Sequence, residues 1–176
     1  PLDREVIFHS ENGILGMGPA PDKENIEPWL INAGKQYITL RPGGSICHHA
    51  DSFAMIRGGH LDLCVLGAFQ VADNGDIANW ARSPDEPVKQ VGGAMDLAVG
   101  AKRLWVAMEH NTKGSGTSRI RKICSYPLTA KGVVKRVYTD LAVLDVTPEG
   151  FVVRDMIQGL TKQTLEERTE AALIWP

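Results

Sequence analysis

Short apolar runs alternate along this chain with polar and glycine-rich segments. The clearest run, at 61–66, is interrupted only by Asp62 and predicts a strand buried on both faces, as in a parallel sheet between helices. Other apolar or alternating runs predict a buried strand at 6–8, short strands at 37–40 and 77–80, and longer ones at 104–108, 133–138, 142–146 and 151–156. We expect the last of these to be an edge strand.

Three short helices are expected between the strands, at 51–57, 95–99 and 164–173. Asp51 or Ser52 is the candidate N-cap of the first, and Thr164 and Glu167 have capping-box spacing in the last. Strands separated by short helices and glycine turns are typical of an α/β fold. The pattern therefore predicts a three-layer α/β sandwich with an open, largely parallel sheet.

Three prolines, at positions 19, 21 and 28, exclude a regular helix or a central strand around them. We expect an exposed excursion there that ends near Trp29. A turn is predicted at 41–44 and a second loop at 82–87. The glycine- and serine-rich segment 113–118 is predicted to be a mobile loop, since it lacks the residue order of a phosphate-binding P-loop.

Composition excludes several classes of partner. The chain has 176 residues, of which 43% are hydrophobic and 23% charged, and its net charge is −2. These values are ordinary for a globular protein with one substantial core. The basic residues are spread along the chain, so we expect neither nucleic acid nor an anionic membrane as a partner. No apolar run is long enough to span a bilayer.

The cysteines indicate a reducing compartment. Cys47, Cys64 and Cys124 form no CxxC pair, and their odd number argues against a disulfide framework and for the cytoplasm. The neighbouring His48 and His49 suggest a metal site with Cys47, but adjacent ligands point in different directions and no spaced third ligand follows. We therefore predict no metal.

The most specific stretch, 10–19, reads Ser-Glu-Asn-Gly-Ile-Leu-Gly-Met-Gly-Pro. It places one carboxylate, Glu11, at the end of a predicted strand, beside glycine backbone that a ligand can approach closely. The string resembles the active-site segment of the class I oxoacid CoA-transferases, in which the glutamate of Ser-Glu-Asn-Gly is the nucleophile. The position that matches this glutamate is Glu11.

Four further blocks carry the same resemblance, in the order and spacing of the B-type subunit of these enzymes: 30–35, 51–80, 92–97 and 141–150. The resemblance implies one domain over 1–176 with a fold like that of CoA-transferases and ribose-phosphate isomerases. It also implies that the N-terminal helix and first glycine-rich strand-loop of the family are lacking here.

The acceptor acid is a finer expectation. Segments 47–53, 126–129 and 138–141 look most like the branch of the family that uses 3-oxoadipate. Acetoacetate or another short-chain 3-oxoacid is the alternative acceptor. A non-catalytic ligand sensor on a related fold is the alternative from another class, but it would not need an acidic residue at position 11.

The resemblance implies a ping-pong transfer of CoA between succinate and a 3-oxoacid, through a glutamyl-CoA thioester on Glu11. Coenzyme A is then a substrate thioester, and no permanently bound cofactor is expected. Each attack builds an oxyanion, which needs hydrogen-bond donors. Similarity to the family assigns these donors to Gly93 and Ala94, with Gly67 and Ala68 on the neighbouring wall.

The resemblance also points to residues that could bind the substrates. Lys35 matches a lysine that lies near the CoA phosphates in related enzymes. His48 and His49 stand where the acetoacetate enzymes tend to carry smaller residues, so we consider them candidates for hydrogen bonding to the distal carboxylate of 3-oxoadipate. No convincing basic pair for a dicarboxylate stands out in the sequence.

The resemblance covers only the B-type half, which implies an A-type partner subunit in an A2B2 hetero-oligomer that closes the site against water.

Overall fold

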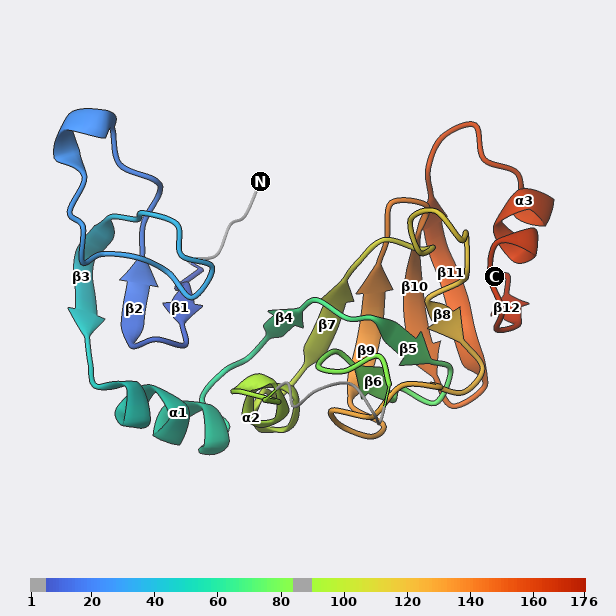
Figure 1. The fold of residues 1–176 in the computed structure, drawn as a ribbon, viewed down its shortest axis with the longest axis horizontal. Helices are drawn as coiled ribbons and strands as arrows, with labels where there is room; N and C mark the ends of the chain where they lie inside the picture. The colour runs from blue at the N-terminus through green and yellow to red at the C-terminus, as the bar shows by residue number, and fades with distance from the viewer. Residues whose placement is uncertain (1–5, 84–89) are drawn as a thin grey trace. The chain divides into compact units, whose positions relative to one another are not determined.

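The computed structural model describes residues 6–83 and 90–176. The chain divides into two compact units, Pro1–Gly58 and Gly59–Pro176, and each is considered by itself (Figure 1). The expectation of one domain over 1–176 stays a prediction. Among the described residues, no helix combines the length and the apolar character that a membrane crossing requires.

The first unit is built on a small antiparallel sheet of order β1-β2-β3. Strands β1 (His9–Ser10) and β2 (Ile14–Met17) form a hairpin, and β3 (Leu40–Ile46) pairs with β2. The excursion between β2 and β3 contains only a short 3-10 helix, η1 (Lys23–Asn25), as its prolines require. Helix α1 (His49–Arg57) follows β3.

Two strand predictions in this unit are wrong. The segment 6–8 is not a buried strand, since Ile7 is 68% and Phe8 56% exposed. The strand expected at 37–40 instead begins at Leu40 and continues through the glycines that were predicted to form a turn. Gly43 has a φ of +83°, and Gly44 lies so close to β2 that a Cβ there would be 2.9 Å from the Leu15 carbonyl oxygen. Glycine therefore allows the strand to bend where a turn was expected.

Helix α1 forms as predicted, with Phe53 and Ile56 buried, but its cap differs. His48 is the N-cap, and its Nδ1 accepts a hydrogen bond from the Ala50 N–H at 3.2 Å. The predicted cap Ser52 is instead fully buried inside the helix, where its Oγ lies 2.7 Å from His9 Nε2. The Ser52 hydroxyl, which local spacing assigned to capping, thus forms a hydrogen bond with His9, a residue distant in the sequence.

The second unit is organised around a six-stranded sheet of order β12-β11-β10-β9-β7-β4. Strands β4, β7 and β9 run parallel, β10 and β11 return antiparallel, and β12 is parallel to β11. The α/β class with a largely parallel sheet is confirmed. The strand bounds are β4 (Cys64–Leu66), β7 (Leu104–Ala107), β9 (Val134–Tyr138), β10 (Ala142–Thr147), β11 (Gly150–Met156) and β12 (Leu173–Ile174).

A second, three-stranded sheet shares a core with the main one. It consists of β5 (Gln70–Ala72), β6 (Ile77–Ala78) and β8 (Ile120–Arg121), in the order β6-β5-β8. Helices α2 (Ala94–Gly100) and α3 (Lys162–Glu167) complete the unit (Figure 1). The core joins side chains of both sheets: Val71, Ile77 and Ile120 with Leu104, Val106, Val137, Leu144 and Phe151.

Edge positions and one helix register were predicted wrongly in this unit. Strand β4 is the edge of the main sheet as described, and Val65 is 55% exposed, so it is not buried on both faces. Strand β11 is not an edge, because β12 pairs with it. Helix α3 begins three residues after Gly159, and Thr161 caps it by accepting from the Thr164 N–H at 3.1 Å. The capping box expected at Thr164 is therefore one turn too late.

Candidate active site

The turn between β1 and β2 carries Glu11 and requires glycine at position 13. Gly13 has a φ of +110°, and its N–H donates to the Ser10 carbonyl at 3.0 Å. The Gly13 carbonyl accepts from the Cys47 N–H at 2.8 Å. A Cβ at Gly13 would lie 2.2 Å from the Cys47 carbonyl oxygen, so no other residue fits.

Residues on both sides of Glu11 are tied to the segment 31–33. Ser10 is 5% exposed, and its Oγ accepts from the Ala33 N–H at 2.8 Å. On the other side, Asn12 Nδ2 donates to the Ile31 carbonyl at 2.7 Å. Glu11 itself is only partly buried. The turn therefore holds the backbone of this carboxylate in place and leaves its side chain within reach of a ligand.

Lys35 lies in the same unit, in a turn with a φ of +62°, where its N–H donates to the Asn32 carbonyl at 2.9 Å. It lines a hollow of about 550 Å³, here called the Lys35 hollow. The other lining residues are mostly apolar and include Met17, Gly18, Pro21, Ile26, Tyr37 and Ile38. A lysine beside an apolar groove suits a long ligand with an anionic group.

His48 and His49 have structural partners at the start of α1. His48 uses Nδ1 for the cap, and the His49 ring packs edge-on against Phe53 at 4.8 Å between centroids. Both residues are exposed. These contacts account for the pair without a substrate, and the role in acceptor recognition stays a prediction.

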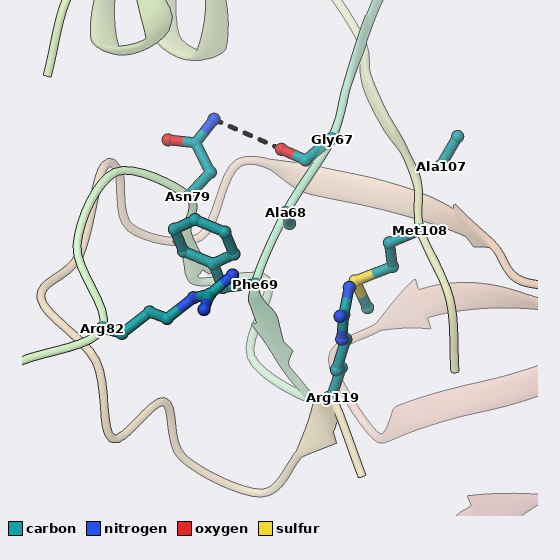
Figure 2. A pocket seen from close by; sticks show the side chains of 8 residues that line it. All are labelled: Gly67, Ala68, Phe69, Asn79, Arg82, Ala107, Met108 and Arg119. Carbon is teal, nitrogen blue, oxygen red and sulfur yellow. Dashed lines mark hydrogen bonds between the residues drawn. The ribbon is translucent and has the colours of Figure 1, made fainter. Parts of the chain in front are cut away.

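Gly67 and Ala68 line a second hollow of about 420 Å³ in the second unit, here called the Gly67 hollow (Figure 2). Gly67 directly follows β4, and Ala107 ends β7 beside it, so the hollow lies at the carboxyl ends of two parallel strands. This is where open α/β sheets bind ligands. Its remaining lining residues are Phe69, Asn79, Arg82, Met108 and Arg119.

Gly93 and Ala94 form the start of α2. Gly93 is the N-cap residue, and its carbonyl accepts from the Leu97 N–H at 3.0 Å. Backbone N–H groups of a first helical turn have no partner within the helix, so they are available as donors. Glu11, Lys35, His48 and His49 thus belong to the first unit, and all four predicted oxyanion residues belong to the second.

Comparison with known proteins identifies the family. A family model described as "Coenzyme A transferase" matches residues 2–165. The chain belongs to the coenzyme A transferase family.

Curated relatives support the family resemblance over nearly the whole chain. It is 52% identical over 174 residues to the B subunit of 3-oxoadipate CoA-transferase from Acinetobacter baylyi, covering 99% of this chain and 80% of that protein. It is 48% identical over 166 residues to the B subunit of succinyl-CoA:3-ketoacid coenzyme A transferase from Helicobacter pylori, covering 94% and 79%. Among solved structures, the Escherichia coli O157:H7 acyl-CoA transferase YdiF aligns with a TM-score of 0.73 at 16% identity, over 97% of this chain and 34% of that one. This likeness shows the fold alone.

Six residues that line the Gly67 hollow of this CoA-transferase chain were not predicted from the sequence, and three of them have polar side chains: Asn79, Arg82 and Arg119. Asn79 Nδ2 donates to the Gly67 carbonyl at 3.3 Å (Figure 2). The Asn79 Oδ1 accepts from Thr129 Oγ1 at 2.6 Å. The two arginines bring positive charge to a hollow in which no basic pair was expected. The only signal in the sequence was their place in loops flanking short strands, which many surface arginines share.

His110 holds the segment that carries Arg119. Its ring is fully buried, with Nδ1 3.0 Å from Thr139 Oγ1 and Nε2 2.9 Å from Thr169 Oγ1. The His110 carbonyl accepts from the Arg119 N–H at 2.9 Å. Burial lowers the pKa of His110 from 6.5 to about 4, so the imidazole is neutral at pH 7. The neutral ring therefore links the segment that carries Arg119 to Thr139 and Thr169 through hydrogen bonds.

The segment predicted as a loop at 113–118 is closed by its own hydrogen bonds. The Thr112 N–H donates to the Thr117 carbonyl at 2.8 Å, and Asn111 Nδ2 donates to the Gly116 carbonyl at 3.1 Å. Asn111 Nδ2 also donates to the Arg168 carbonyl at 2.8 Å, which ties the loop to the end of α3. The loop predicted at 82–87 lies mainly outside the described residues, at 84–89.

Proposed function

We propose that this chain is the B subunit of a succinyl-CoA:3-oxoadipate CoA-transferase. The observation that carries the proposal is Glu11, held on a glycine-braced turn in a chain that is 52% identical to the B subunit of a 3-oxoadipate CoA-transferase. Succinyl-CoA is the donor and 3-oxoadipate the acceptor. Coenzyme A enters only as a thioester substrate.

In the proposed mechanism, the Glu11 carboxylate attacks the thioester carbonyl and forms a mixed anhydride, with CoA thiolate as the leaving group. The thiolate then attacks the glutamyl carbonyl, which releases succinate and leaves a glutamyl-CoA thioester. The acceptor acid runs the same steps in reverse. No general base takes part, because both nucleophiles are already anionic.

Backbone donors from glycine-rich turns stabilise the oxyanions in this proposal. Gly93 and Ala94 supply N–H groups at the start of α2, and Gly67 and Ala68 form the neighbouring wall. Lys35 binds a phosphate of CoA, supported by its position beside the apolar Lys35 hollow. His48 and His49 are kept as a secondary site for the acceptor carboxylate.

A partner subunit completes the proposed enzyme. Relatives at 48–52% identity are named as B subunits, which supports an A-type partner, and we propose an A2B2 assembly in the cytoplasm. Trp29, which is 91% exposed, is a candidate contact. The partner's role is to exclude water, since an exposed acyl intermediate would be hydrolysed.

Reconstitution tests this proposal. The full-length chain is assayed alone and with an A-type subunit, using succinyl-CoA and either 3-oxoadipate or acetoacetate. We expect transfer only with the partner, a preference for 3-oxoadipate, and inactivation by borohydride after exposure to succinyl-CoA alone. Full activity without the partner would overturn the assembly, and absence of a reducible glutamyl thioester would overturn the mechanism.

A second acceptor is supported by one observation. The chain is 48% identical to a B subunit named for 3-ketoacids in general, close to the 52% of the 3-oxoadipate relatives. A preference for acetoacetate in the same assay would favour that acceptor. A non-catalytic ligand sensor would give neither transfer nor a glutamyl thioester.

A further inference from the structure

The segment 30–38, here called the 30–38 hairpin, folds back on itself within the first unit. Ile31 and Tyr37 form an antiparallel bridge. At the tip, the Asn32 N–H donates to the Gln36 carbonyl at 2.9 Å, and Asn32 Oδ1 accepts from the Gln36 N–H at 3.0 Å. All of these contacts lie within the segment, so we expect the hairpin to keep its shape as one piece.

Lys35, at the tip of this hairpin, has an unfavourable backbone conformation. Its φ of +62° makes it the only residue other than glycine with a positive φ in the ranges 6–83 and 90–176. Hairpin corners usually have glycine at such a left-handed position, and here the glycine stands one place earlier, at Gly34. Lys35 is exposed, so burial does not compensate for the strain. An exposed residue in a strained conformation indicates that its side chain is needed there.

Two hydrogen bonds attach the hairpin to the Glu11 turn, one from each neighbour of the carboxylate. Ser10 Oγ accepts from the Ala33 N–H at 2.8 Å, and Asn12 Nδ2 donates to the Ile31 carbonyl at 2.7 Å. Both bonds end on backbone atoms of the hairpin, so they fix its main chain directly. A single bond would act as a pivot, whereas two bonds on either side of Glu11 also oppose rotation of the turn against the hairpin.

The Lys35 hollow lies between the hairpin and the strand that leaves the Glu11 turn. Met17 ends β2, and Gly18 follows it, whereas Gln36, Tyr37 and Ile38 belong to the hairpin. The hollow has a volume of about 550 Å³, within the range of roughly 300–1,000 Å³ typical of small-molecule sites. The surface that would hold the ligand and the turn that carries the carboxylate are therefore parts of one connected structure.

We propose that Ser10 and Asn12 are positioning residues that lock the Glu11 turn to the 30–38 hairpin, so that the nucleophile and Lys35 form one rigid body. The inference rests on the proposed function, in which Glu11 attacks the thioester and Lys35 binds a phosphate of CoA. A thioester anchored at Lys35 then meets the Glu11 carboxylate at a fixed place. Reacting atoms must approach to about 3–3.5 Å, so a small displacement of the turn slows the attack.

The test measures the first half-reaction on the reconstituted enzyme. Ser10→Ala and Asn12→Ala should each slow formation of the borohydride-reducible glutamyl thioester by about 10-fold, and the double variant by about 100-fold, the effect of a displacement of about 1 Å. The Kd of CoA, measured by calorimetry, should stay close to wild type, because Lys35 keeps its place in a hairpin with its own hydrogen bonds. Unchanged rates in all three variants would overturn the inference. A loss of affinity as large as the loss of rate would also overturn it, because the two residues would then only support the CoA site.

Thr39→Val is the matched control. Thr39 Oγ1 donates to the Pro19 carbonyl at 2.9 Å, so this variant loses a side chain–backbone bond of the same kind in the same unit. The bond does not involve the Glu11 turn, and Thr39 does not line the Lys35 hollow. Thioester formation should therefore proceed at the wild-type rate, and thermal unfolding shows that each variant is folded. A loss of rate equal to that in Asn12→Ala would assign the effect to general loosening of the unit and overturn the inference.

Lys35→Asn tests why a lysine occupies the left-handed position. Asparagine adopts this conformation more readily than lysine, so Tm should rise by about 1–3 °C. The KM for succinyl-CoA should rise about 10-fold, since the charge-assisted contact with phosphate is lost. A lower Tm together with an unchanged KM would show that Lys35 only stabilises the hairpin, and would remove it from the proposed rigid body.

Hydrogen exchange separates failure of this inference from failure of the proposed function. Adenosine 3′,5′-bisphosphate supplies phosphates for Lys35 without a pantetheine arm that could reach Glu11. We expect it to slow exchange of the Gly13 amide, which donates to the Ser10 carbonyl, in the wild-type assembly but not in the Ser10→Ala, Asn12→Ala double variant. Such slowing in a wild type that transfers no CoA would reject the proposed function and keep the rigid body. Transfer by wild type with unchanged rates in the variants would do the reverse.

Discussion

The Glu11 turn and the Gly67 hollow are built in opposite ways. The turn is a contiguous stretch, 10–13, whose shape depends on one glycine and a few backbone hydrogen bonds. The hollow collects residues from four separate stretches of the chain, around positions 67, 79, 107 and 119. A local site is recognisable from its residue order and is intolerant of backbone change. A dispersed site is only partly visible in the sequence: Gly67 and Ala68 were assigned from the family resemblance, whereas Asn79, Arg82 and Arg119 were not. Such a site is tuned through individual side chains.

Substitution of Glu11 should have the largest effect. Glu11→Ala removes the proposed nucleophile, so CoA transfer by the reconstituted enzyme should be abolished. Glu11→Asp withdraws the carboxylate by about 1 Å and should reduce kcat on the order of 100-fold. Steady-state kinetics and borohydride trapping measure both, and wild-type turnover by Glu11→Ala would reject the covalent mechanism.

Gly13→Ala tests whether the turn itself matters. The added Cβ would meet the Cys47 carbonyl oxygen at 2.2 Å, so the turn must move and Glu11 with it. We expect a loss of about 100-fold or more in kcat, since a shift of about 1 Å has that effect on positioned groups.

Gly43→Ala is the matched control for this prediction. Gly43 belongs to the same unit and has a φ of +83°, but a Cβ there meets nothing within 4 Å. It should cost only the backbone strain of about 1–2 kcal/mol in unfolding free energy and retain most activity. Equal kinetic losses in the two variants would show that strain alone, and not displacement of Glu11, is responsible.

The buried His110 ring predicts how stability depends on pH. Burial lowers its pKa to about 4 in the folded state, against 6.5 when exposed, so the unfolded chain binds the extra proton between these values. The contribution of neutral His110 to the unfolding free energy should therefore be fully present above pH 6.5. It should decrease as the pH falls towards 4, by at most about 3 kcal/mol.

Denaturant titrations of wild type and His110→Gln measure this contribution as a difference. Burial also lowers the pKa of His9, and that residue contributes equally to both proteins. The stability difference between the two proteins should shrink from pH 7 to pH 4.5. A constant difference would exclude His110 as the titrating group.

Replacement of His48 and His49 should give the smallest effect. Serine is a good N-cap, so the double change to serine should keep α1 intact. If the pair recognises the distal carboxylate, kcat/KM should fall a few-fold more for 3-oxoadipate than for acetoacetate, as expected for an exposed hydrogen bond. An unchanged ratio would reject a role for the pair in acceptor recognition.

Local chemistry was sufficient for much of this protein. The pattern of apolar residues predicted β7, β9 and β10 to within two residues, and glycines and prolines placed the excursion before Trp29. The string around Glu11 identified the nucleophile candidate, because a tight glycine turn is encoded by neighbouring residues. The family assignment follows from such contiguous strings and is confirmed by the family match.

Tertiary structure decided what neighbouring residues could not. The sequence made Ser52 a plausible cap, but its hydroxyl is hydrogen-bonded to His9 in the folded protein. It made β11 a plausible edge strand, but β12 pairs with it. Arg82 and Arg119 are 37 positions apart and have no shared pattern in the sequence, yet the packing of two sheets places them in one hollow. Long-range pairing depends on which surfaces the whole chain buries together, and this information is not contained in any local segment.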